Sequence, residues 1–373
     1  MTNPFVVTYH QTDEQNIEIA VRKLVNHLPV STLYLGFSFF GPTDTDSYLA
    51  EYEIIKSIIQ SHLHYIPLIS FIPQPMCGSY SYGLEITELK SENLRPQFKA
   101  LDGIRYLVVP TGWGQVLMVE CVNAGCLNEP YSVQSKIVFQ KLNAIFVVEG
   151  FRVSDIVRQW NYIGNILDSE NGNQHYQLFN NARSEFYSQV IFENGYPAAT
   201  GISMLVNCLF ISVTAIKALP ETRIIPVDNA LQVPAWKYSG SVLVSGLTDK
   251  ELSTPKFERG KMVIKNNAVI FYVSGTAAIR NELSMKQKDV SLQTKQTIEN
   301  INYLISAENL RSQHIENEFN LTLQSIRVYI KQKDDFEAVK KVVELEWPQV
   351  KAIYVQAEVC RDGLLVEIEG IAE

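Results

Sequence analysis

The spacing of apolar residues predicts strands followed by helices in the middle of the chain. Between Val153 and Leu167 apolar residues recur at intervals of three and four, which is typical of a helix that buries one face. Ser154 could cap the start of this helix. A β-rich stretch precedes it, at Tyr106 to Cys121 and Ile137 to Val148, and a second helix is expected over Tyr176 to Gln189.

A later block repeats this order of elements. A strand-like segment, Lys261 to Tyr272, leads through a Ser274-Gly275-Thr276 turn into a helix expected at about Asp289 to Ile305. A strand, a helix and two further strands are then expected at Leu321 to Ile330, Phe336 to Leu345, Val350 to Val359 and Leu364 to Ile371. This order predicts α+β layering with helices on one face of each sheet. Two such units can cover each other's free faces, which would leave a ligand cleft between them.

Length and composition agree with two ordered globular units. The chain has 373 residues, more than the roughly 250 to 300 at which one core stops growing. Apolar residues make up 46% and charged residues 19%, as in globular proteins. The apolar run Leu33 to Phe40 is far shorter than the about 20 residues of a membrane helix, so we interpret it as a buried strand.

The N-terminus and the cysteines indicate a cytoplasmic protein without membrane association. Met1-Thr2-Asn3-Pro4 does not lead into the basic and apolar regions of a secretory signal. The five cysteines are an odd number, which favours free thiols in a reducing compartment.

Charge and motif patterns exclude several classes of function. A net charge of -8 without a cluster of Lys and Arg argues against nucleic-acid binding, although one or two arginines could still bind a small anion. His62 and His64 would share one side of a strand, but neither they nor Cys121 and Cys126 have partners at metal-ligand spacing. Phosphate-binding and nucleophile-elbow motifs are absent from the sequence. We therefore predict no metal and no cofactor.

The last predicted strand carries two glutamates on one face. Glu367 and Glu369 alternate with apolar residues that share the opposite face, namely Leu364, Val366 and Ile368. The two glutamates could lie on a sheet face that is open to water. Alternatively, they line a cleft, where partial burial raises the pKa of a carboxyl group and suits it to donate a proton near neutral pH.

Two residues just before this strand could belong to the same site. Arg361 could bind a ligand carboxylate through two hydrogen bonds, or form a surface salt bridge of little energetic value. Cys360 is by default a small buried apolar residue.

The run from Cys360 to Gly370 resembles the C-terminal signature of the chorismatases, which are relatives of the YjgF/RidA proteins. Matching stretches occur in the same order at Arg158 to Ile163, Tyr176 to Arg183, Pro197 to Gly201, Val233 to Ala235, Phe257 to Gly260 and Ser274 to Ala277. The helix Gln293 to Leu304 resembles the corresponding helix of RidA proteins. The resemblance runs from about residue 100 to the end, whereas residues 1 to about 95 are at best weakly related.

The resemblance implies an α+β fold of two YjgF/RidA-like, chorismate-mutase-like units, with mixed sheets that each carry helices on one face. We expect an N-terminal domain with an N-terminal extension over residues 1–218 and a C-terminal domain over residues 219–373. Two fused units can supply both walls of a cleft, so we expect a monomer or small homo-oligomer.

The resemblance also implies an activity, hydrolysis of the enolpyruvyl ether of chorismate to pyruvate and a hydroxybenzoate or dihydroxycyclohexadiene carboxylate. Glu367 would be the acid that protonates the methylene carbon. Cys360 would be a second catalytic residue and would mark the 3-hydroxybenzoate synthase-like type. The substrate would contact Arg361 and Arg183 through its carboxylates, Tyr176 and Tyr162 through its ring, and the stretch that contains Gly275 and Thr276. Both tyrosines could instead pack in the core.

One stretch differs from the family pattern. Where chorismatases continue with an Ile-Val-Gly-His-Glu-Ser-like run, this chain has Ala278 to Ser284, and its Arg280 could contact an anion or lie in solvent. Two alternative functions stay open: a RidA-like imine deaminase that uses Arg361 with a glutamate-held water, and a non-catalytic protein that binds aromatic acids.

Overall fold

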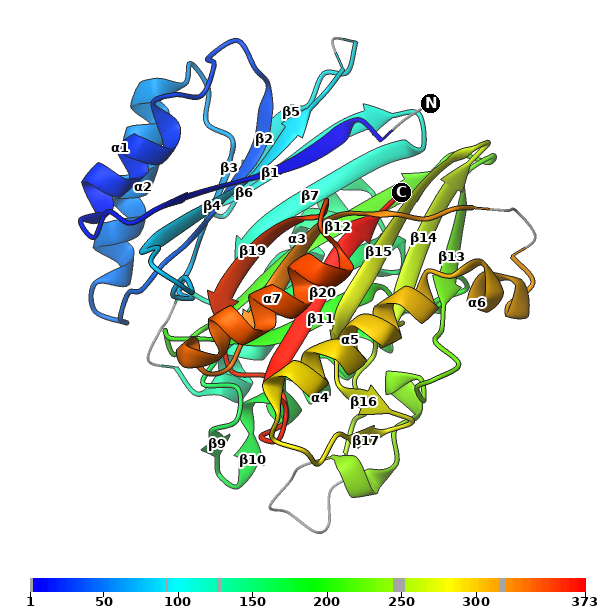
Figure 1. Ribbon diagram of the computed structural model, residues 1–373. Helices are drawn as coiled ribbons and strands as arrows, with labels where there is room; N and C mark the ends of the chain where they lie inside the picture. The colour runs from blue at the N-terminus through cyan, green and yellow to red at the C-terminus, as the bar shows by residue number, and fades with distance from the viewer. Residues whose placement is uncertain (1–2, 92, 126–128, 244–251, 316–318) are drawn as a thin grey trace.

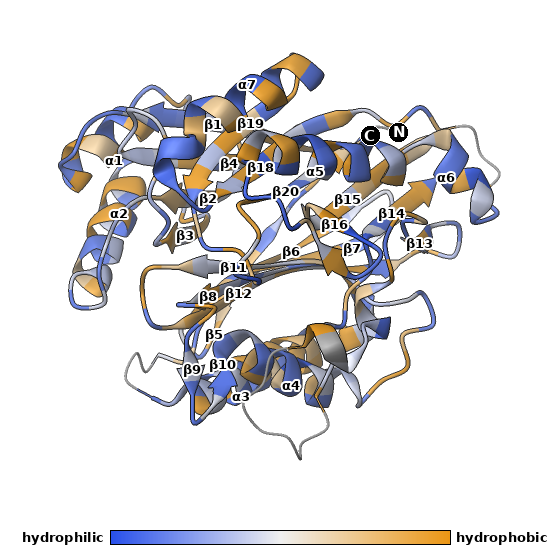
Figure 2. Cartoon of the chain, turned by 60° about the horizontal axis from the view of Figure 1, so that its bottom comes forward, coloured by the Kyte–Doolittle hydropathy of each residue, from blue (hydrophilic) through white to orange (hydrophobic). Residues whose placement is uncertain are grey.

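The computed structural model describes residues 3–91, 93–125, 129–243, 252–315 and 319–373. Within these ranges the strands form three larger sheets from successive stretches of the chain, each with helices on its outer side (Figure 1). We call these stretches the first, second and third units. Figure 2 shows the helices around the outside and the sheets toward the middle.

The first unit is a four-stranded mixed sheet in the order β1-β4-β2-β3, in which β2 and β3 are parallel. Its elements are β1 (Phe5–Thr12), α1 (Ile17–Val25), β2 (Tyr34–Phe40), α2 (Tyr48–His62), β3 (Leu68–Ile72) and β4 (Tyr82–Leu89). The side chain of Asn16 caps α1 by accepting a hydrogen bond from the Ile19 backbone N–H at 3.1 Å. The buried strand predicted at Leu33 to Phe40 is confirmed as β2.

The second unit is a six-stranded mixed sheet in the order β11-β8-β12-β7-β6-β5. Its elements are β5 (Gln97–Leu101), β6 (Ile104–Thr111), β7 (Gly114–Val122), α3 (Tyr131–Glu149), β8 (Ile156–Gly164), β9 (Ser169–Glu170), β10 (Asn173–Gln174), α4 (His175–Tyr187), β11 (Ala198–Met204) and β12 (Leu209–Ala218). The short strands β9 and β10 form a separate two-stranded ribbon. The helix predicted at Tyr176 to Gln189 corresponds to α4.

The third unit is a six-stranded mixed sheet in the order β13-β14-β15-β20-β18-β19. Its elements are β13 (Arg223–Val227), β14 (Gly260–Lys265), β15 (Ala268–Ala277), β16 (Ile279–Arg280), β17 (Leu283–Ser284), α5 (Val290–Leu304), α6 (Ala307–Ser312), β18 (Leu323–Ile330), α7 (Phe336–Glu346), β19 (Lys351–Gln356) and β20 (Val366–Ala372). The helix predicted at Asp289 to Ile305 is confirmed as α5, with Asp289 as its N-cap.

The same strand order occurs in all three units. The order β19-β18-β20-β15 of the third unit corresponds to β11-β8-β12-β7 of the second and to β3-β2-β4-β1 of the first. The expected α+β layering with helices on one face is thus confirmed, and the N-terminal residues repeat the plan without its first two strands. The chain passes from the second sheet to the third between Ala218 and Arg223. We propose this connection as the boundary between the two predicted domains.

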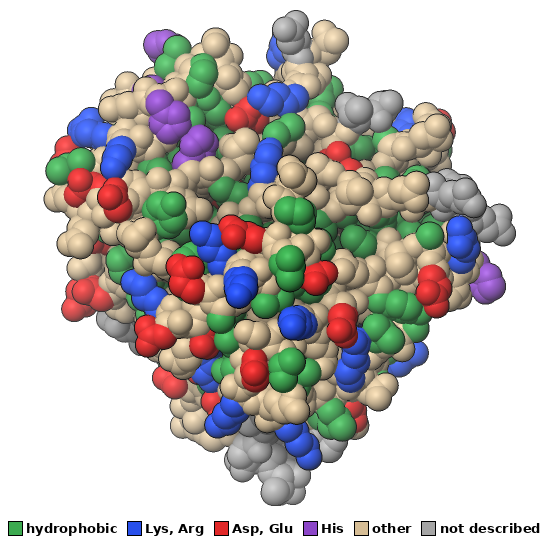
Figure 3. Space-filling view, in the orientation of Figure 1, with side chains coloured by type: hydrophobic (Ala, Val, Ile, Leu, Met, Phe, Trp, Pro, Cys, Tyr) green, Lys and Arg blue, Asp and Glu red, His purple; other side chains and the backbone are tan. Residues whose placement is uncertain are grey.

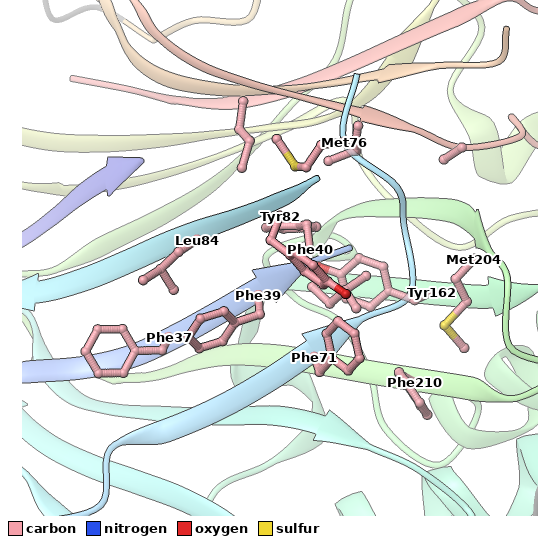
Figure 4. Close-up of a cluster of buried hydrophobic side chains, with 14 of the residues drawn as sticks. Phe37, Phe39, Phe40, Phe71, Met76, Tyr82, Leu84, Tyr162, Met204 and Phe210 are labelled. Carbon is pink, nitrogen blue, oxygen red and sulfur yellow. The ribbon is translucent and has the colours of Figure 1, made fainter. Parts of the chain in front are cut away.

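The three sheets meet at equivalent edges. β3 lies beside β7, β11 beside β15, and β19 beside β1. Isolated backbone bridges join the units at Met76 with Val355 and at Ile202 with Val359. Figure 4 shows one cluster of buried side chains to which all three units contribute, and in which Phe40 of the first unit lies close to Tyr162 of the second. The sheets therefore cover one another's free faces. On the outer face drawn in Figure 3, acidic and basic side chains are interspersed.

Two element predictions in the second unit are wrong. The predicted helix from Val153 to Leu167 is a 3₁₀ turn at Val153–Asp155 followed by β8, so Ser154 does not cap an α-helix. Almost every residue of β8 is buried because the strand is covered on both faces, and such a strand does not show the alternation of a half-exposed one. The predicted strand from Ile137 to Val148 lies inside α3, whose buried positions recur at helical spacing despite its β-branched residues.

Two local predictions also fail. Ser274-Gly275-Thr276 is not a turn but part of β15, where the pairing with β20 shifts by one residue at a β-bulge. His62 does not lie on a strand but ends α2, and its Nε2 is 3.0 Å from the carbonyl oxygen of Leu28. None of the described helices is both long and apolar enough to cross a membrane.

Candidate active site

A cavity lies between the second and third units. Its walls come from α4, from β15 and β20, and from the loops that precede β14 and β20. The lining residues are Gln174, Tyr176, Gln177, Asn180, Tyr238, Val242, Leu243, Pro255, Phe257, Arg259, Gly275, Ala277, Ile279, Cys360, Arg361, Leu364 and Glu367. Mostly apolar walls with a few polar groups are typical of sites for small organic ligands.

Glu367 is the carboxyl group of this cavity. Its side chain is buried at 4% relative exposure, and burial raises its pKa to about 8, with a further upward contribution from Glu369. Arg158 and Arg259 oppose this rise without cancelling it. Glu367 is therefore predominantly protonated at neutral pH and can donate a proton into an apolar cavity.

Gly275 leaves the space that the carboxyl of Glu367 fills. A Cβ built on Gly275 would overlap Oε1 of Glu367. The backbone N–H of Gly275 donates a hydrogen bond of 3.1 Å to Oγ1 of Thr200 in β11. The β-bulge thus brings the third unit's backbone against both the acid and the second unit.

Glu369 lies two residues further along the same face of β20, in the opposite charge state. It accepts hydrogen bonds from Arg158 and Thr200, from the indole of Trp160 at 2.9 Å and from the hydroxyl of Tyr329 at 3.0 Å. Burial acts to raise its pKa, but Arg158, Arg327 and the hydrogen bonds outweigh burial and lower it. The strand therefore presents one neutral and one ionised carboxyl group. Glu367 can act as a proton donor, while Glu369 stays negatively charged.

Two arginines reach the cavity. Arg361 donates a hydrogen bond of 2.7 Å to the carbonyl of Glu282, and its guanidinium lies 4.9 Å from the centre of the Tyr238 ring. Arg259 is buried at 2% exposure and donates to the Tyr238 hydroxyl at 2.5 Å and to the carbonyl of Val233 at 2.9 Å. In the described part of the chain, its Nε has no hydrogen-bond partner. Arg259 is a cavity residue that the sequence did not predict, although it lies in the family-like stretch Phe257 to Gly260.

The predicted Arg183 does not line the cavity. It is a buried residue of α4, donates a hydrogen bond of 2.6 Å to Oδ1 of Asn180 and lies over the ring of Phe179. Asn180 lines the cavity instead, and its buried Nδ2 has no hydrogen-bond partner among the described residues. Asn180 was a further residue that sequence analysis did not single out.

The other predicted binding residues separate into two groups. Tyr176 and Gly275 line the cavity, as do Cys360 and Arg361. Tyr162 lies outside it, where its hydroxyl accepts a hydrogen bond of 2.6 Å from Arg327. Thr276 is buried, and its hydroxyl donates to the carbonyl of Ser274 at 2.9 Å.

Cys360 holds a neutral thiol beside the acid. Burial raises its pKa to about 12, and Glu367 adds to the rise. Cys77 and Cys121 are also free thiols, whereas Cys126 lies outside the described residues. Throughout the described ranges, we find no group of three or more His, Cys, Asp or Glu side chains that could hold a metal ion.

Comparison with known proteins agrees with this geometry. Residues 114–215 match the family model of the N-terminal domain of FkbO/Hyg5-like chorismatases, and residues 258–373 match that of endoribonuclease L-PSP. The chain is 31% identical over 233 residues to a 3-hydroxybenzoate synthase and 26% identical over 227 residues to a chorismatase, both from Streptomyces hygroscopicus. The chain is related to the chorismatases. The resemblance noted in the sequence is confirmed.

The extent of these similarities differs between sequence and fold. The alignments cover 60% and 58% of this chain and 65% and 61% of the two relatives, so the chain spans slightly less than two thirds of the length of these relatives. A crystal structure of a chorismatase superposes with a TM-score of 0.71 at 18% identity, and the match covers 99% of this chain and 98% of that one. The chorismatase fold therefore extends over the whole chain, including the first unit.

The stretch that differs from the chorismatase pattern forms part of the cavity's support. Arg280 pairs with Glu299 of α5 at 2.7 Å and also bonds to Asn300, so it contacts protein groups. The carboxylate of Glu282 accepts hydrogen bonds from the backbone N–H of Ser239 at 2.9 Å and from its hydroxyl at 2.7 Å. The β16–β17 hairpin thereby holds both Arg361 and the segment that follows Tyr238.

In this chorismatase relative, the internal repeat shows that the acid belongs to the third unit. β7 has a bulge at the same place as β15, since Val122 pairs with Ile211 as Thr276 pairs with Ile368. This register places Phe210 where the third unit has Glu367. Phe210 packs against Tyr48 with 5.3 Å between ring centres, inside the cluster of Figure 4. The second unit therefore fills the equivalent space with an aromatic ring.

Proposed function

We propose that the protein cleaves the enolpyruvyl ether of chorismate and releases pyruvate with a hydroxybenzoate or dihydroxycyclohexadiene carboxylate. The observation that carries this proposal is the neutral carboxyl of Glu367 in a mostly apolar cavity that also holds Arg259 and Arg361. An enol ether is protonated on carbon only by an acid that is held against it, and a carboxylic acid that stays neutral near pH 7 meets this need.

The reaction starts with transfer of the Glu367 proton to the methylene carbon of the enolpyruvyl group. A C–H bond forms, and the ether oxygen shares the positive charge of the resulting oxocarbenium ion, which the Glu367 carboxylate stabilises. Water then adds to the oxocarbenium carbon and returns one proton to Glu367, and the hemiketal releases pyruvate and a diol. Alternatively, the neighbouring ring hydroxyl attacks the ring carbon that bears the ether, so that the bond from this carbon to the pyruvate oxygen breaks and a protonated epoxide forms. The epoxide then opens at its other carbon, and the ring carbon that keeps the oxygen loses the proton that restores Glu367 and completes the aromatic ring.

The arginines supply the positive charge that a dicarboxylate needs. We propose that Arg361 and Arg259 bind the two carboxylates through charge-assisted hydrogen bonds. Arg183 then acts through Asn180, which it holds toward the cavity. Tyr176, together with Tyr238 and Phe257, forms the ring-sized wall. We assign no substrate contact to Tyr162 or Thr276, because neither lines the cavity.

The cavity lining and the relatives favour an aromatic product. The rings of Tyr176, Tyr238 and Phe257 line the cavity and suit a ring acid, whereas the three-carbon substrate of an imine deaminase has no ring to pack against them. Because one of the two relatives reported above is named a 3-hydroxybenzoate synthase, we propose this product type. The neutral thiol of Cys360 then contacts the ring without acting as a base or nucleophile.

The site needs no second copy of the chain, since α4, β15 and β20 of one chain supply its walls. We therefore propose a monomer. The free thiols fit a reducing compartment, and we propose a cytoplasmic location.

Turnover of chorismate tests this function. Purified protein is incubated with chorismate, pyruvate is followed through lactate dehydrogenase, and the ring product is identified by chromatography. We expect equimolar pyruvate and 3-hydroxybenzoate. Pyruvate at the background rate would contradict the proposal. Ammonia release from 2-aminoacrylate would then indicate a deaminase, and a thermal shift with 3-hydroxybenzoate but no turnover would indicate a binding protein.

A further inference from the structure

A chain of four alternating charges lies buried where the three sheets meet. Arg327 of β18 forms two hydrogen bonds of 2.6 Å to the carboxylate of Glu85 in β4, and its Nη1 is 3.4 Å from Oε1 of Glu369. Arg158 of β8 bonds to the other oxygen of Glu369. Each of the four side chains is at most 10% exposed. Every unit thus contributes at least one charge.

Stability alone does not account for this network. Removing four charges from water costs free energy that their mutual attraction often fails to recover, and apolar residues of similar volume can be equally stable. Two positive and two negative groups do balance, so none is left unpaired. The location suggests a role, because Glu369 is two residues from Glu367 on the same face of β20.

We propose that Glu369 and Glu85 are positioning residues for the acid: the chain Glu85–Arg327–Glu369–Arg158 fixes a permanent negative charge next to Glu367 and thereby keeps Glu367 protonated. This rests on the proposed function only in taking Glu367 as the reactive group. The first unit, through Glu85, then contributes to the chemistry of a cavity that it does not line.

The geometry gives the sign and size of the effect. Two residues along a strand are separated by roughly 7 Å, and a unit charge at that distance in a protein environment shifts a neighbouring pKa by roughly one to two units. The negative charge of Glu369 raises the pKa of Glu367, in agreement with the direction found for this group. Glu85 acts in the same direction but more weakly, because it is further away and acts through Arg327.

Charged and titratable groups from several elements face this pair. Around Glu367 they are Arg158 of β8, Arg259 before β14, Tyr176 of α4 and Cys360 before β20. Around Glu369 they are Arg158 and Tyr162 of β8, Arg327 and Tyr329 of β18, and Tyr9 of β1. Burial raises the pKa of each of these tyrosines, so they stay neutral near pH 7. The three arginines and Glu369 therefore set the local charge.

The test measures the protonation state of Glu367 directly. Infrared spectra of the full-length protein are recorded against pH, and the band of the protonated carboxyl that disappears in Glu367→Gln is assigned to this residue. Wild-type protein should keep the band through neutral pH. In Glu369→Gln the titration midpoint should fall by roughly one to two pH units, and in Glu85→Gln it should fall by less. Glu88→Gln, on the same strand as Glu85 but without contact to Arg327, should leave it unchanged.

The outcomes separate this inference from the proposed function. An unchanged midpoint in folded Glu369→Gln and Glu85→Gln protein, or loss of the wild-type band below neutral pH, overturns the inference whether or not chorismate is turned over. If Glu369→Gln does not fold, Glu85→Gln and the wild-type titration still decide it. A purely structural role would lower the melting temperature of both variants without moving the midpoint.

Discussion

The backbone of Gly275 lies directly against the carboxyl of Glu367, because the bulge in β15 turns residue 275 toward the neighbouring strand β20. Any Cβ at this position would overlap Oε1 of Glu367. The absence of a side chain at residue 275 therefore fixes where the acid points.

Replacing this glycine should displace the acid without unfolding the protein. In Gly275→Ala we expect a fall in kcat of roughly 100-fold, since a displacement of about 1 Å can cost that much. Gly36→Ala in β2 is the matched control, because its Cβ would have only ordinary contacts at 3.8 Å. Steady-state pyruvate release with circular dichroism for folding checks the prediction, and a wild-type kcat in Gly275→Ala would show that the contact does not position Glu367.

The raised pKa of Glu367 predicts the high-pH limb of the activity. The acid works only while protonated, so kcat/KM should be constant below a pH of about 8 and fall by about tenfold per unit above it. An ordinary glutamate would lose its proton near pH 4.3, so activity would already be lost at neutral pH. A pH profile of pyruvate release distinguishes the two cases.

Stability should depend on the same proton. The folded-state pKa of Glu367 is raised, so its contribution to stability is full below the unfolded-state pKa and is lost as pH rises through about 8. The wild type should therefore lose stability as the pH rises from about 6 to about 9, which are about two units below and one unit above that pKa. Glu367→Gln should not show this loss, so its free energy of unfolding should rise relative to that of the wild type over the same range. Urea unfolding at both values checks this, and a stability difference that does not change with pH would argue against a buried neutral acid.

Arg361 should contribute more to substrate binding than to the chemical step. Removing a charge-assisted hydrogen bond costs roughly 1.5 to 3 kcal/mol, so Arg361→Gln should raise KM for chorismate by roughly 10- to 100-fold with a smaller effect on kcat. Arg22→Gln in α1, which breaks only an exposed pair with Glu18, is the control. A change in kcat alone would place Arg361 in a different role.

The hairpin that departs from the chorismatase pattern gives a further prediction. Glu282 holds the segment after Tyr238 through two hydrogen bonds to Ser239, and its carbonyl holds Arg361. Glu282→Ala keeps the carbonyl but loses the carboxylate, so we expect KM to rise several-fold. Glu344→Ala in α7 removes an exposed carboxylate elsewhere and serves as control. Equal KM values in the two variants would show that the hairpin does not support the cavity.

The sequence predicted the third unit better than the second. α5 and α7 each bury one face, and β20 alternates between core and cavity, so their periodicity is readable. β8 is buried on both faces, and its apolar residues happen to follow a helical spacing. α3 contains enough Ile and Val to suggest a strand, although packing against the sheet makes it a helix.

Part of the site could not be read from the sequence because it is assembled from distant segments. Alternation placed Glu367 and Glu369 on one face, but their different charge states depend on Arg158 from another sheet and on Arg327 from the neighbouring strand β18. Arg259 precedes a strand in a segment with no periodic signal, and only the folded chain brings it to the cavity. Ser274-Gly275-Thr276 has residues that favour a turn, whereas pairing with β20 makes it a bulged part of β15.

The most direct test of the account compares chorismate turnover by wild-type protein and Glu367→Gln. The amide cannot donate the required proton, so kcat should fall by roughly 100- to 10,000-fold, while the affinity for 3-hydroxybenzoate, measured by calorimetry, stays close to that of the wild type. Pyruvate release from Glu367→Gln at a rate near that of the wild type would contradict the account.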